Sequence, residues 1–161
     1  MSKAVSESID IRAYDVFLSF RGEDTRRSFT GNLYNYLEKR GIHTFIGDYD
    51  FESGEEIKAS LSEAIERSRV FVIVFSENYA SSSWCLDELV RILDFTEDNH
   101  RPVIPVFYYV DPSDVRHQKG IYGEALAMHE RRLNHESYKV MKWRNALRQA
   151  ATLSGWPFKH G

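Results

Sequence analysis

One pattern restricts the fold of this chain more than any other: short apolar runs alternate with segments in which apolar residues recur every three or four positions. This alternation is typical of a parallel β-sheet with helices on both faces. The predicted strands are Asp15 to Ser19, His43 to Ile46, Val70 to Phe75, Val103 to Tyr108 and a short fifth strand at Gly155 to Phe158. The sequence therefore predicts an α/β fold.

The segments between these strands each carry one apolar stripe of helical spacing. The stripes are Phe29, Leu33, Tyr36 and Leu37; Ile57, Leu61, Ala64 and Ile65; Leu86, Leu89, Val90 and Leu93; and Val140, Trp143, Leu147 and Ala150. Gly41 indicates the end of the first helix, and the serines at 81–83 supply N-cap hydroxyls for the third. The Asp111-Pro112 pair indicates a turn, and a further helix is predicted from Ile121 to Arg132.

The composition fits a single globular domain. The 161 residues are 42% hydrophobic and 28% charged, which allows a core without metal or disulfide staples. The single cysteine, Cys85, permits no internal disulfide and favours a reducing compartment, the cytosol. A net charge of -3 disfavours a dedicated nucleic-acid-binding domain, and the apolar runs are shorter than the roughly 20 residues of a membrane helix.

The loop after the first predicted strand has the residues of an anion site. Ligands of parallel sheets bind beyond the carboxyl ends of the strands, and the segment from Phe20 to Arg26 combines glycine with arginines there. Backbone N–H groups and guanidinium groups in this arrangement can hold phosphate. In the alternative interpretation, which the pattern alone favours, Glu23 and Asp24 complement a helix dipole and the arginines are solvated. Neither a P-loop nor a G-x-G-x-x-G motif is present.

The loop after the third strand contains a tryptophan one helical turn before a carboxylate. Helical geometry places Trp84 and Glu88 one above the other, on a face roughly opposite the stripe that includes Leu86 and Leu89. A stacking platform beside a catalytic acid is one interpretation. In the alternative, which the pattern again favours, Trp84 covers the preceding loop and Glu88 is a surface residue. The acidic loop from Gly47 to Glu56 is either a mobile lid or an ordinary solvated connection.

Four long motifs lie within the segment from Tyr14 to Phe158: YDVFLSFRGEDTRRSF, FSENYASSSWCLDEL, PVFYYVDPSDVR and YGEALAMHE. With these motifs the chain resembles the plant Toll/interleukin-1 receptor (TIR) domain. The resemblance implies a flavodoxin-like three-layer sandwich of about five parallel strands, usually found at the N-terminus of a nucleotide-binding leucine-rich-repeat immune receptor. Residues 1–13 would be a flexible segment, 14–158 the TIR domain and 159–161 the start of a linker to further domains. The implied location is cytoplasmic, with the nucleus as an additional one.

The resemblance also implies an activity. Such domains resemble hydrolases that, once assembled, cleave NAD+ or NADP+ to nicotinamide and signalling nucleotides, which trigger defence and cell death. Glu88 would be the catalytic residue, and neither a metal nor a cofactor is implied. The residues matched to NAD binding are Phe20, Arg21, Gly22, Glu23, Asp24, Thr25, Arg26, Gly54 and Trp84.

Homo-oligomerisation through TIR–TIR contacts is a further implication of the resemblance. The residues matched to self-association are Gly31, Asn32, Tyr36, Lys142, Arg144 and Gly123. Gly31-Asn32 stands where relatives commonly have Ser-His, and Ser53 where they usually have arginine or lysine, which predicts weaker self-association and altered phosphate contact. The alternative function is a non-catalytic interaction scaffold. A phosphoacceptor receiver is disfavoured because no acidic cluster surrounds an aspartate at a strand end.

Overall fold

The computed structural model describes residues 13–47, 55–134, 137–153 and 155–158. They form a parallel five-stranded sheet in the order β2-β1-β3-β4-β5. The strands are β1 Tyr14–Ser19, β2 Thr44–Ile46, β3 Ser68–Phe75, β4 Val103–Tyr108 and β5 Trp156–Phe158. All five predicted strands are confirmed. The strand order places the carboxyl ends of β2, β1 and β3 side by side.

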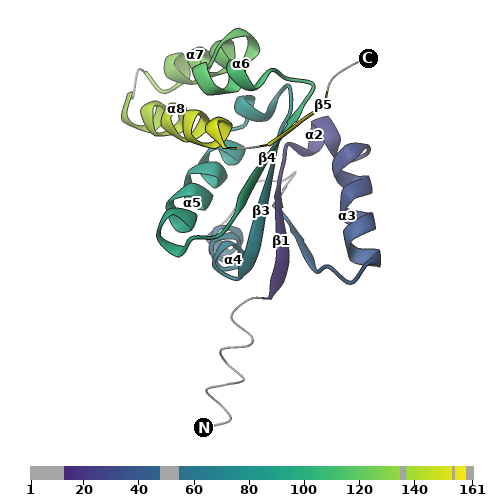
Figure 1. Ribbon diagram of the computed structural model, residues 1–161. Helices are drawn as coiled ribbons and strands as arrows, with labels where there is room; N and C mark the ends of the chain where they lie inside the picture. The colour runs from purple at the N-terminus through teal and green to yellow at the C-terminus, as the bar shows by residue number, and fades with distance from the viewer. Residues whose placement is uncertain (1–12, 48–54, 135–136, 154, 159–161) are drawn as a thin grey trace.

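Helices cover both faces of this sheet (Figure 1). The elements are α2 Gly22–Thr25, α3 Phe29–Lys39, α4 Glu55–Glu66, the 3-10 turn η1 Tyr79–Ser81, α5 Ser83–Asn99, α6 Pro112–His117, α7 Gly120–Arg132 and α8 Ser137–Thr152. In Figure 1, α3 lies on one side of the sheet, whereas α4, α5 and α8 lie on the other. The predicted three-layer α/β sandwich is therefore confirmed.

Alternation along the strands divides the core into two parts. On β1, Phe17 belongs to the larger cluster, which α4, α5 and α8 cover, whereas its neighbour Leu18 belongs to the smaller cluster against α3. Successive side chains of a strand point to opposite faces, so each strand serves both clusters. The apolar stripe of α3 reaches the smaller cluster through Phe29 and Leu33.

Two details of the predicted elements are wrong. The helical spacing places Tyr36 in the apolar stripe of its helix, but its side chain is 53% exposed, with the Arg40 guanidinium 4.5 Å from its ring centre. The sheet face under α3 is already covered by Phe29 and Leu33, which leaves Tyr36 outside. Asp111 and Pro112 begin helix α6 rather than a simple turn, because the Asp111 carboxylate accepts a 2.7 Å hydrogen bond from the Ser113 N–H and proline is favourable at a first helical position.

Other boundaries agree with the sequence signals. Gly41 follows α3 with φ +79°, and the Ser82 hydroxyl caps α5 by accepting from the Cys85 N–H at 3.1 Å. The predicted terminal segments (except residue 13) and most of the acidic second loop, Ser53 and Gly54 included, lie outside the described residues. Among the helices that the structure describes, none combines the length and apolarity required to cross a membrane.

Candidate functional site

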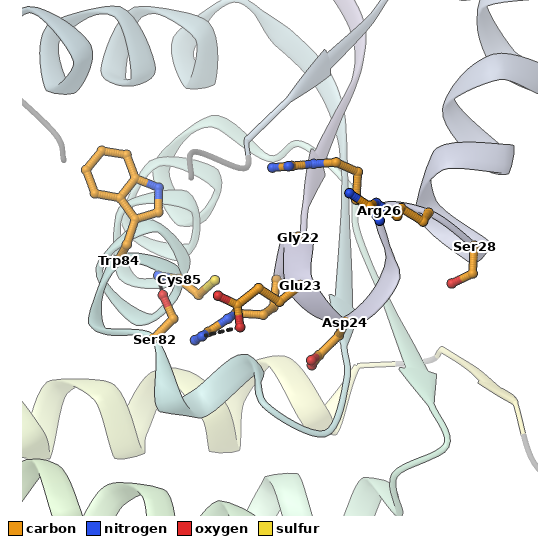
Figure 2. A pocket seen from close by; sticks show the side chains of 10 residues that line it. Gly22, Glu23, Asp24, Arg26, Ser28, Ser82, Trp84 and Cys85 are labelled. Atoms are coloured by element: carbon orange, nitrogen blue, oxygen red, sulfur yellow. Dashed lines mark hydrogen bonds and ion pairs between the residues drawn. The ribbon is translucent and has the colours of Figure 1, made fainter. Parts of the chain in front are cut away.

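A cavity of about 630 Å³ opens at the carboxyl end of β1, between the segment that follows this strand and the start of α5. In Figure 2, Arg26 and Glu23 come from the segment after β1, whereas Trp84 and Cys85 come from α5. The lining residues are Arg21, Gly22, Glu23, Asp24, Arg26, Arg27, Ser28, Ser82, Trp84 and Cys85. The fold therefore brings together most of the residues that the sequence matched to NAD binding.

Two residues of that set lie behind the cavity wall. Phe20 is 1% exposed and packs in the smaller core cluster, while its carbonyl oxygen accepts from the Cys85 thiol at a donor–acceptor distance of 3.7 Å. Thr25 is also buried, and its hydroxyl is hydrogen-bonded to that of Thr30. Both side chains are directed inward, so they support the cavity without lining it.

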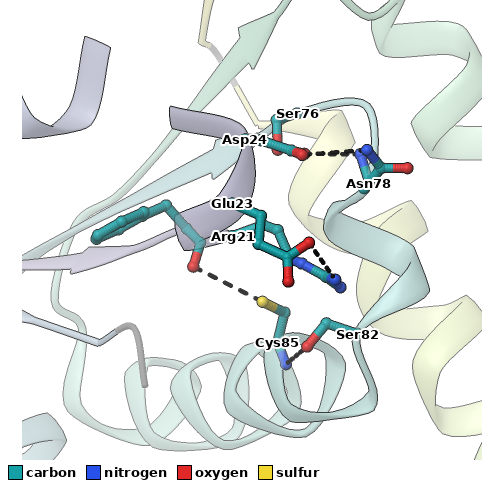
Figure 3. A network of polar contacts seen from close by, with 8 residues as sticks. Arg21, Glu23, Asp24, Ser76, Asn78, Ser82 and Cys85 are labelled. Atoms are coloured by element: carbon teal, nitrogen blue, oxygen red, sulfur yellow. Dashed lines mark hydrogen bonds and ion pairs between the residues drawn. The ribbon is translucent and has the colours of Figure 1, made fainter. Parts of the chain in front are cut away.

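Asp24 connects two loops of the site (Figure 3). Its carboxylate accepts hydrogen bonds from the Ser76 hydroxyl at 2.6 Å, the Asn78 N–H at 2.8 Å and the Asn78 side-chain amide at 3.1 Å. Ser76 and Asn78 follow β3, which the sheet places next to β1. The interpretation of Asp24 as a dipole-complementing residue alone is therefore wrong. The Arg21 guanidinium forms an ion pair with Glu23, with 3.2 Å between Arg21 Nη2 and Glu23 Oε2. This guanidinium is therefore not merely solvated.

Replacement of Asp24 by alanine is expected to lower the free energy of unfolding by about 2 kcal/mol, because hydrogen bonds to a charged acceptor contribute about 1.5–3 kcal/mol. Urea unfolding of the two proteins measures the difference. Glu77→Ala is the control, because Glu77 is an exposed carboxylate in the same loop as Ser76 and Asn78. Equal stabilities of the Asp24→Ala and Glu77→Ala proteins would show that the connection between the loops contributes nothing.

Glu88 is buried, with 1% of its surface exposed. The predicted position on a face away from the core is therefore wrong, and so is the surface alternative. Its helix, α5, is packed against the sheet and α8 and also contacts α4, so the face that carries Glu88 is covered too. Within the described part of the chain, neither carboxylate oxygen has a hydrogen-bond partner of good geometry.

Burial raises the pKa of Glu88 to about 8, while the Ser19 hydroxyl and the Arg91 guanidinium act in the opposite direction. The carboxyl group is thus largely protonated at neutral pH. The hydroxyl groups of Ser19 and Tyr79 lie 2.9 Å apart, and the Tyr79 hydroxyl also donates to the Cys85 carbonyl at 3.2 Å. Burial raises the pKa of the Cys85 thiol to about 12, so this group is neutral as well.

Glu88 does not line the cavity. Trp84, one turn earlier on α5, does line it, and its half-buried ring also packs against the larger core cluster. The structure thus places the tryptophan and the arginines at one cavity, whereas the carboxyl group is buried and lies outside the cavity lining. This separation is the main difference from the arrangement that the sequence predicted.

The residues matched to self-association are placed unequally. Asn32 and Tyr36 are exposed on α3, and Lys142 is exposed on α8. Arg144 is half-buried, and its Nη2 lies 3.1 Å from Oε1 of Glu130 on α7. The two glycines, both half-buried, pack closely against backbone of their own chain. A Cβ at Gly31 would collide with the Arg26 carbonyl oxygen, and one at Gly123 would lie 2.5 Å from the Gln118 carbonyl oxygen.

The sequence reasoning missed three residues of this region. No distinctive sequence signal marks Ser76 or Asn78. Their role depends on Asp24, which lies 52 residues before Ser76 and 54 residues before Asn78. The sequence marks Gly47 only as the start of the acidic loop. It is buried directly beside the Glu88 carboxyl group. A glycine directly after a predicted strand was the one available signal.

A parallel sheet covered by helices on both faces, with a polar cavity beyond β1, defines this chain as an α/β domain with a ligand-sized cavity at the carboxyl end of its sheet. Residues 13–160 match the TIR domain family, and the chain belongs to this family. It is 55% identical over 151 residues to the disease resistance protein RUN1 of Vitis rotundifolia, covering 92% of this chain and 11% of that protein. It is 48% identical over 152 residues to the TMV resistance protein N of Nicotiana glutinosa, covering 94% of this chain and 13% of that protein.

A solved structure gives the same result for the fold. The TIR domains in the structure of the activated Roq1 resistosome, described as directly recognizing the pathogen effector XopQ, superpose with a TM-score of 0.81 at 51% identity. The match covers 89% of this chain and 87% of that chain. The present chain thus spans about a tenth of the length of the disease resistance proteins that it matches.

Proposed function

We propose that this domain cleaves NAD+ or NADP+ at the bond between nicotinamide and ribose, and that it does so when several copies associate within an immune receptor in the cytoplasm or nucleus. The observation that carries the proposal is the cavity itself, bordered by Trp84 and by arginines, with a buried carboxyl group of raised pKa one helical turn along α5 from Trp84. Membership in the TIR family and the assembled state of the Roq1 relative support it.

The reaction needs little from the protein. The C1′–N bond breaks, and its electron pair leaves with the nicotinamide ring, which is positively charged in the substrate and neutral as a product. Water then forms a C1′–O bond and releases a proton, which yields ADP-ribose. No general acid is required for such a leaving group. An ionised carboxylate would stabilise the positive charge that develops on the ribose, as carboxylates do in glycoside hydrolysis.

In this proposal each part of the cavity has one task. The guanidinium groups of Arg26 and Arg27, both exposed, would contact the pyrophosphate of the dinucleotide. The Trp84 ring would stack on an aromatic base. Glu88 would act as a carboxylate after leaving its buried position, because a protonated acid outside the cavity lining cannot stabilise a cation in the cavity. Its ionisation predicts activity that increases as the pH rises toward 8.

The second candidate is a non-catalytic scaffold that binds other TIR domains. One observation favours it: the Glu88 carboxyl group is protonated and does not line the cavity. The exposed faces of α3 and α8, with Tyr36 and Lys142, would then carry the function alone. The two candidates differ in whether the buried carboxyl group has any task beyond folding.

NAD+ consumption by the artificially clustered domain distinguishes them. We expect Glu88→Gln to lower the turnover at least about 100-fold, because a neutral amide cannot stabilise the developing charge. Glu97→Gln is the matched control, since it makes the same chemical change at an exposed position of the same helix, and its turnover should remain normal. The oligomeric state of each protein is measured alongside. Intact NAD+ with all three clustered proteins would support the scaffold, and equal turnover by all three would show that Glu88 is not the catalytic group.

A further inference from the structure

Gly47, the residue after β2, lies directly against the Glu88 carboxyl group. A Cβ built on Gly47 would be 2.6 Å from Glu88 Oε2, 3.0 Å from Oε1 and 2.8 Å from Phe17 Cε1. The distances to Oε2 and to the Phe17 ring are shorter than a real Cβ tolerates, and the distance to Oε1 is unusually tight. Gly47 is buried, and its N–H donates to the Leu18 carbonyl at 2.8 Å, so the sheet fixes its position. The carboxyl group therefore occupies space that exists because residue 47 has no side chain.

This space holds the carboxyl group in a state that cannot serve the reaction. Within the described residues, neither oxygen has a hydrogen-bond partner of good geometry, and the group is absent from the cavity wall that Trp84 and Cys85 form on the same helix. A carboxylate that stabilises a cation must be ionised and must face the substrate. The arrangement seen here satisfies neither condition, so it corresponds to a resting position.

We propose that Gly47 forms a niche that holds the Glu88 carboxyl group away from the adjoining cavity and thereby restrains NAD+ cleavage by the unassembled domain. The proposal rests on the proposed function for its activity part, whereas its structural part concerns Gly47 and Glu88 alone. Replacement of Gly47 by alanine fills this space, so the Phe17 ring and the Glu88 carboxyl group, which ends a flexible side chain, must shift away from residue 47. Gly47 acts through Glu88 and is in this sense a positioning residue.

The groups around the niche limit how Glu88 can titrate. Ser19 at the end of β1 and Arg91 of α5 favour the ionised form, whereas burial opposes it. Tyr79 of η1 and Cys85 of α5 also face Glu88, and burial raises the pKa of both, so they remain neutral at neutral pH. Phe17 and Gly47 contribute no charge. A carboxyl group expelled from this surrounding regains water, and its pKa falls toward the ordinary value.

The structural part is tested by thermal unfolding without any substrate. Glu88→Gln is compared with the native protein at pH 5 and pH 7.5, once with Gly47 and once in a Gly47→Ala background. We expect the gain in Tm from Glu88→Gln at pH 7.5 to fall to less than half in the Gly47→Ala background, because the expelled carboxyl group no longer carries the burial penalty. An unchanged gain in both backgrounds would overturn the niche.

The activity part is tested with dilute and with clustered protein. We expect dilute Gly47→Ala protein to consume NAD+ at least about 5-fold faster than the native domain, with a pH profile shifted to lower pH. Gly41→Ala is the control: Gly41 has φ +79° and no atom within 4 Å of a Cβ, so the replacement introduces strain far from Glu88. This control should not accelerate turnover.

The two tests separate the possible failures. If the Tm results are as expected but neither the native protein nor the Gly47→Ala protein consumes NAD+ when clustered, the proposed function fails and the niche remains. If clustered native protein consumes NAD+ and Gly47→Ala slows the reaction or leaves it unchanged, the restraining role is overturned. A Gly47→Ala protein that does not fold is replaced by Gly47→Ala combined with Glu88→Asp, whose shorter side chain withdraws the oxygens from the added methyl group. If the Gly47→Ala replacement still prevents folding in that combination, the contact with the carboxyl group is not what Gly47 relieves, and the proposal falls.

Discussion

Replacement of Glu88 by glutamine is expected to raise the free energy of unfolding by about 3 kcal/mol at pH 7. Burial raises the pKa of Glu88 to about 8 from an ordinary value of 4.5. At pH 7 the Glu88 side chain is ionised in the unfolded chain and protonated in the folded chain. Folding therefore binds a proton at a pH at which the free side chain would release it, and this lowers the free energy of unfolding. Each pH unit between these two pKa values costs about 1.4 kcal/mol. Glutamine has a similar volume and avoids this cost.

The pH dependence gives the sign of the effect. A raised folded-state pKa means that the contribution of Glu88 to stability is complete below about pH 4.5 and is lost as the pH rises to about 8. The advantage of Glu88→Gln should therefore be small near pH 5 and reach a maximum near pH 8. Urea unfolding at several pH values measures it, and Glu97→Gln on the exposed side of α5 should show no such trend. Parallel curves for all three proteins would contradict the buried, protonated state of Glu88.

Trp143→Ala is expected to lower the free energy of unfolding by about 4 kcal/mol, or roughly 8–16 °C in Tm for a domain of this size. Trp143 is 1% exposed and is among the largest fully buried side chains. Its ring packs edge-to-face on His129 of α7 at 5.0 Å between centres, and its indole N–H donates to Asp87 of α5 at 2.9 Å. Alanine removes both contacts and leaves a cavity where α5, α7 and α8 meet.

Lys142→Ala is the matched control for this prediction. Lys142 precedes Trp143 on α8, but its side chain is exposed, with its ammonium group 5.2 Å from the centre of the Tyr138 ring. Its replacement should change the stability by less than about 0.5 kcal/mol. Thermal and urea unfolding of the two proteins provide the comparison. A loss below about 1 kcal/mol for Trp143→Ala would show that the three helices do not depend on this side chain.

Glu88 and Trp143 also show how far a helical pattern can be taken. The spacing of Val140, Trp143 and Leu147 correctly placed Trp143 toward the core, because α8 has one buried face. The same reasoning placed Glu88 away from the core and was wrong, because α5 packs against neighbours on several sides. A periodic stripe shows where one buried face lies, but it does not show how many faces are buried.

The sequence by itself determined the fold class, the five strands, the five longer helices and the loop that supplies most of the cavity wall, because these depend on local periodicity and on turn and cap residues that act within a few positions. Family motifs in the sequence also identified the TIR domain. Only the tertiary structure decided that Asp24 connects to Ser76 and Asn78, that Glu88 is buried and protonated, and that Gly47 provides its space. These features depend on how β1, β2 and α5 approach one another, and no spacing along the chain records distances between side chains that sheet pairing and helix packing bring together.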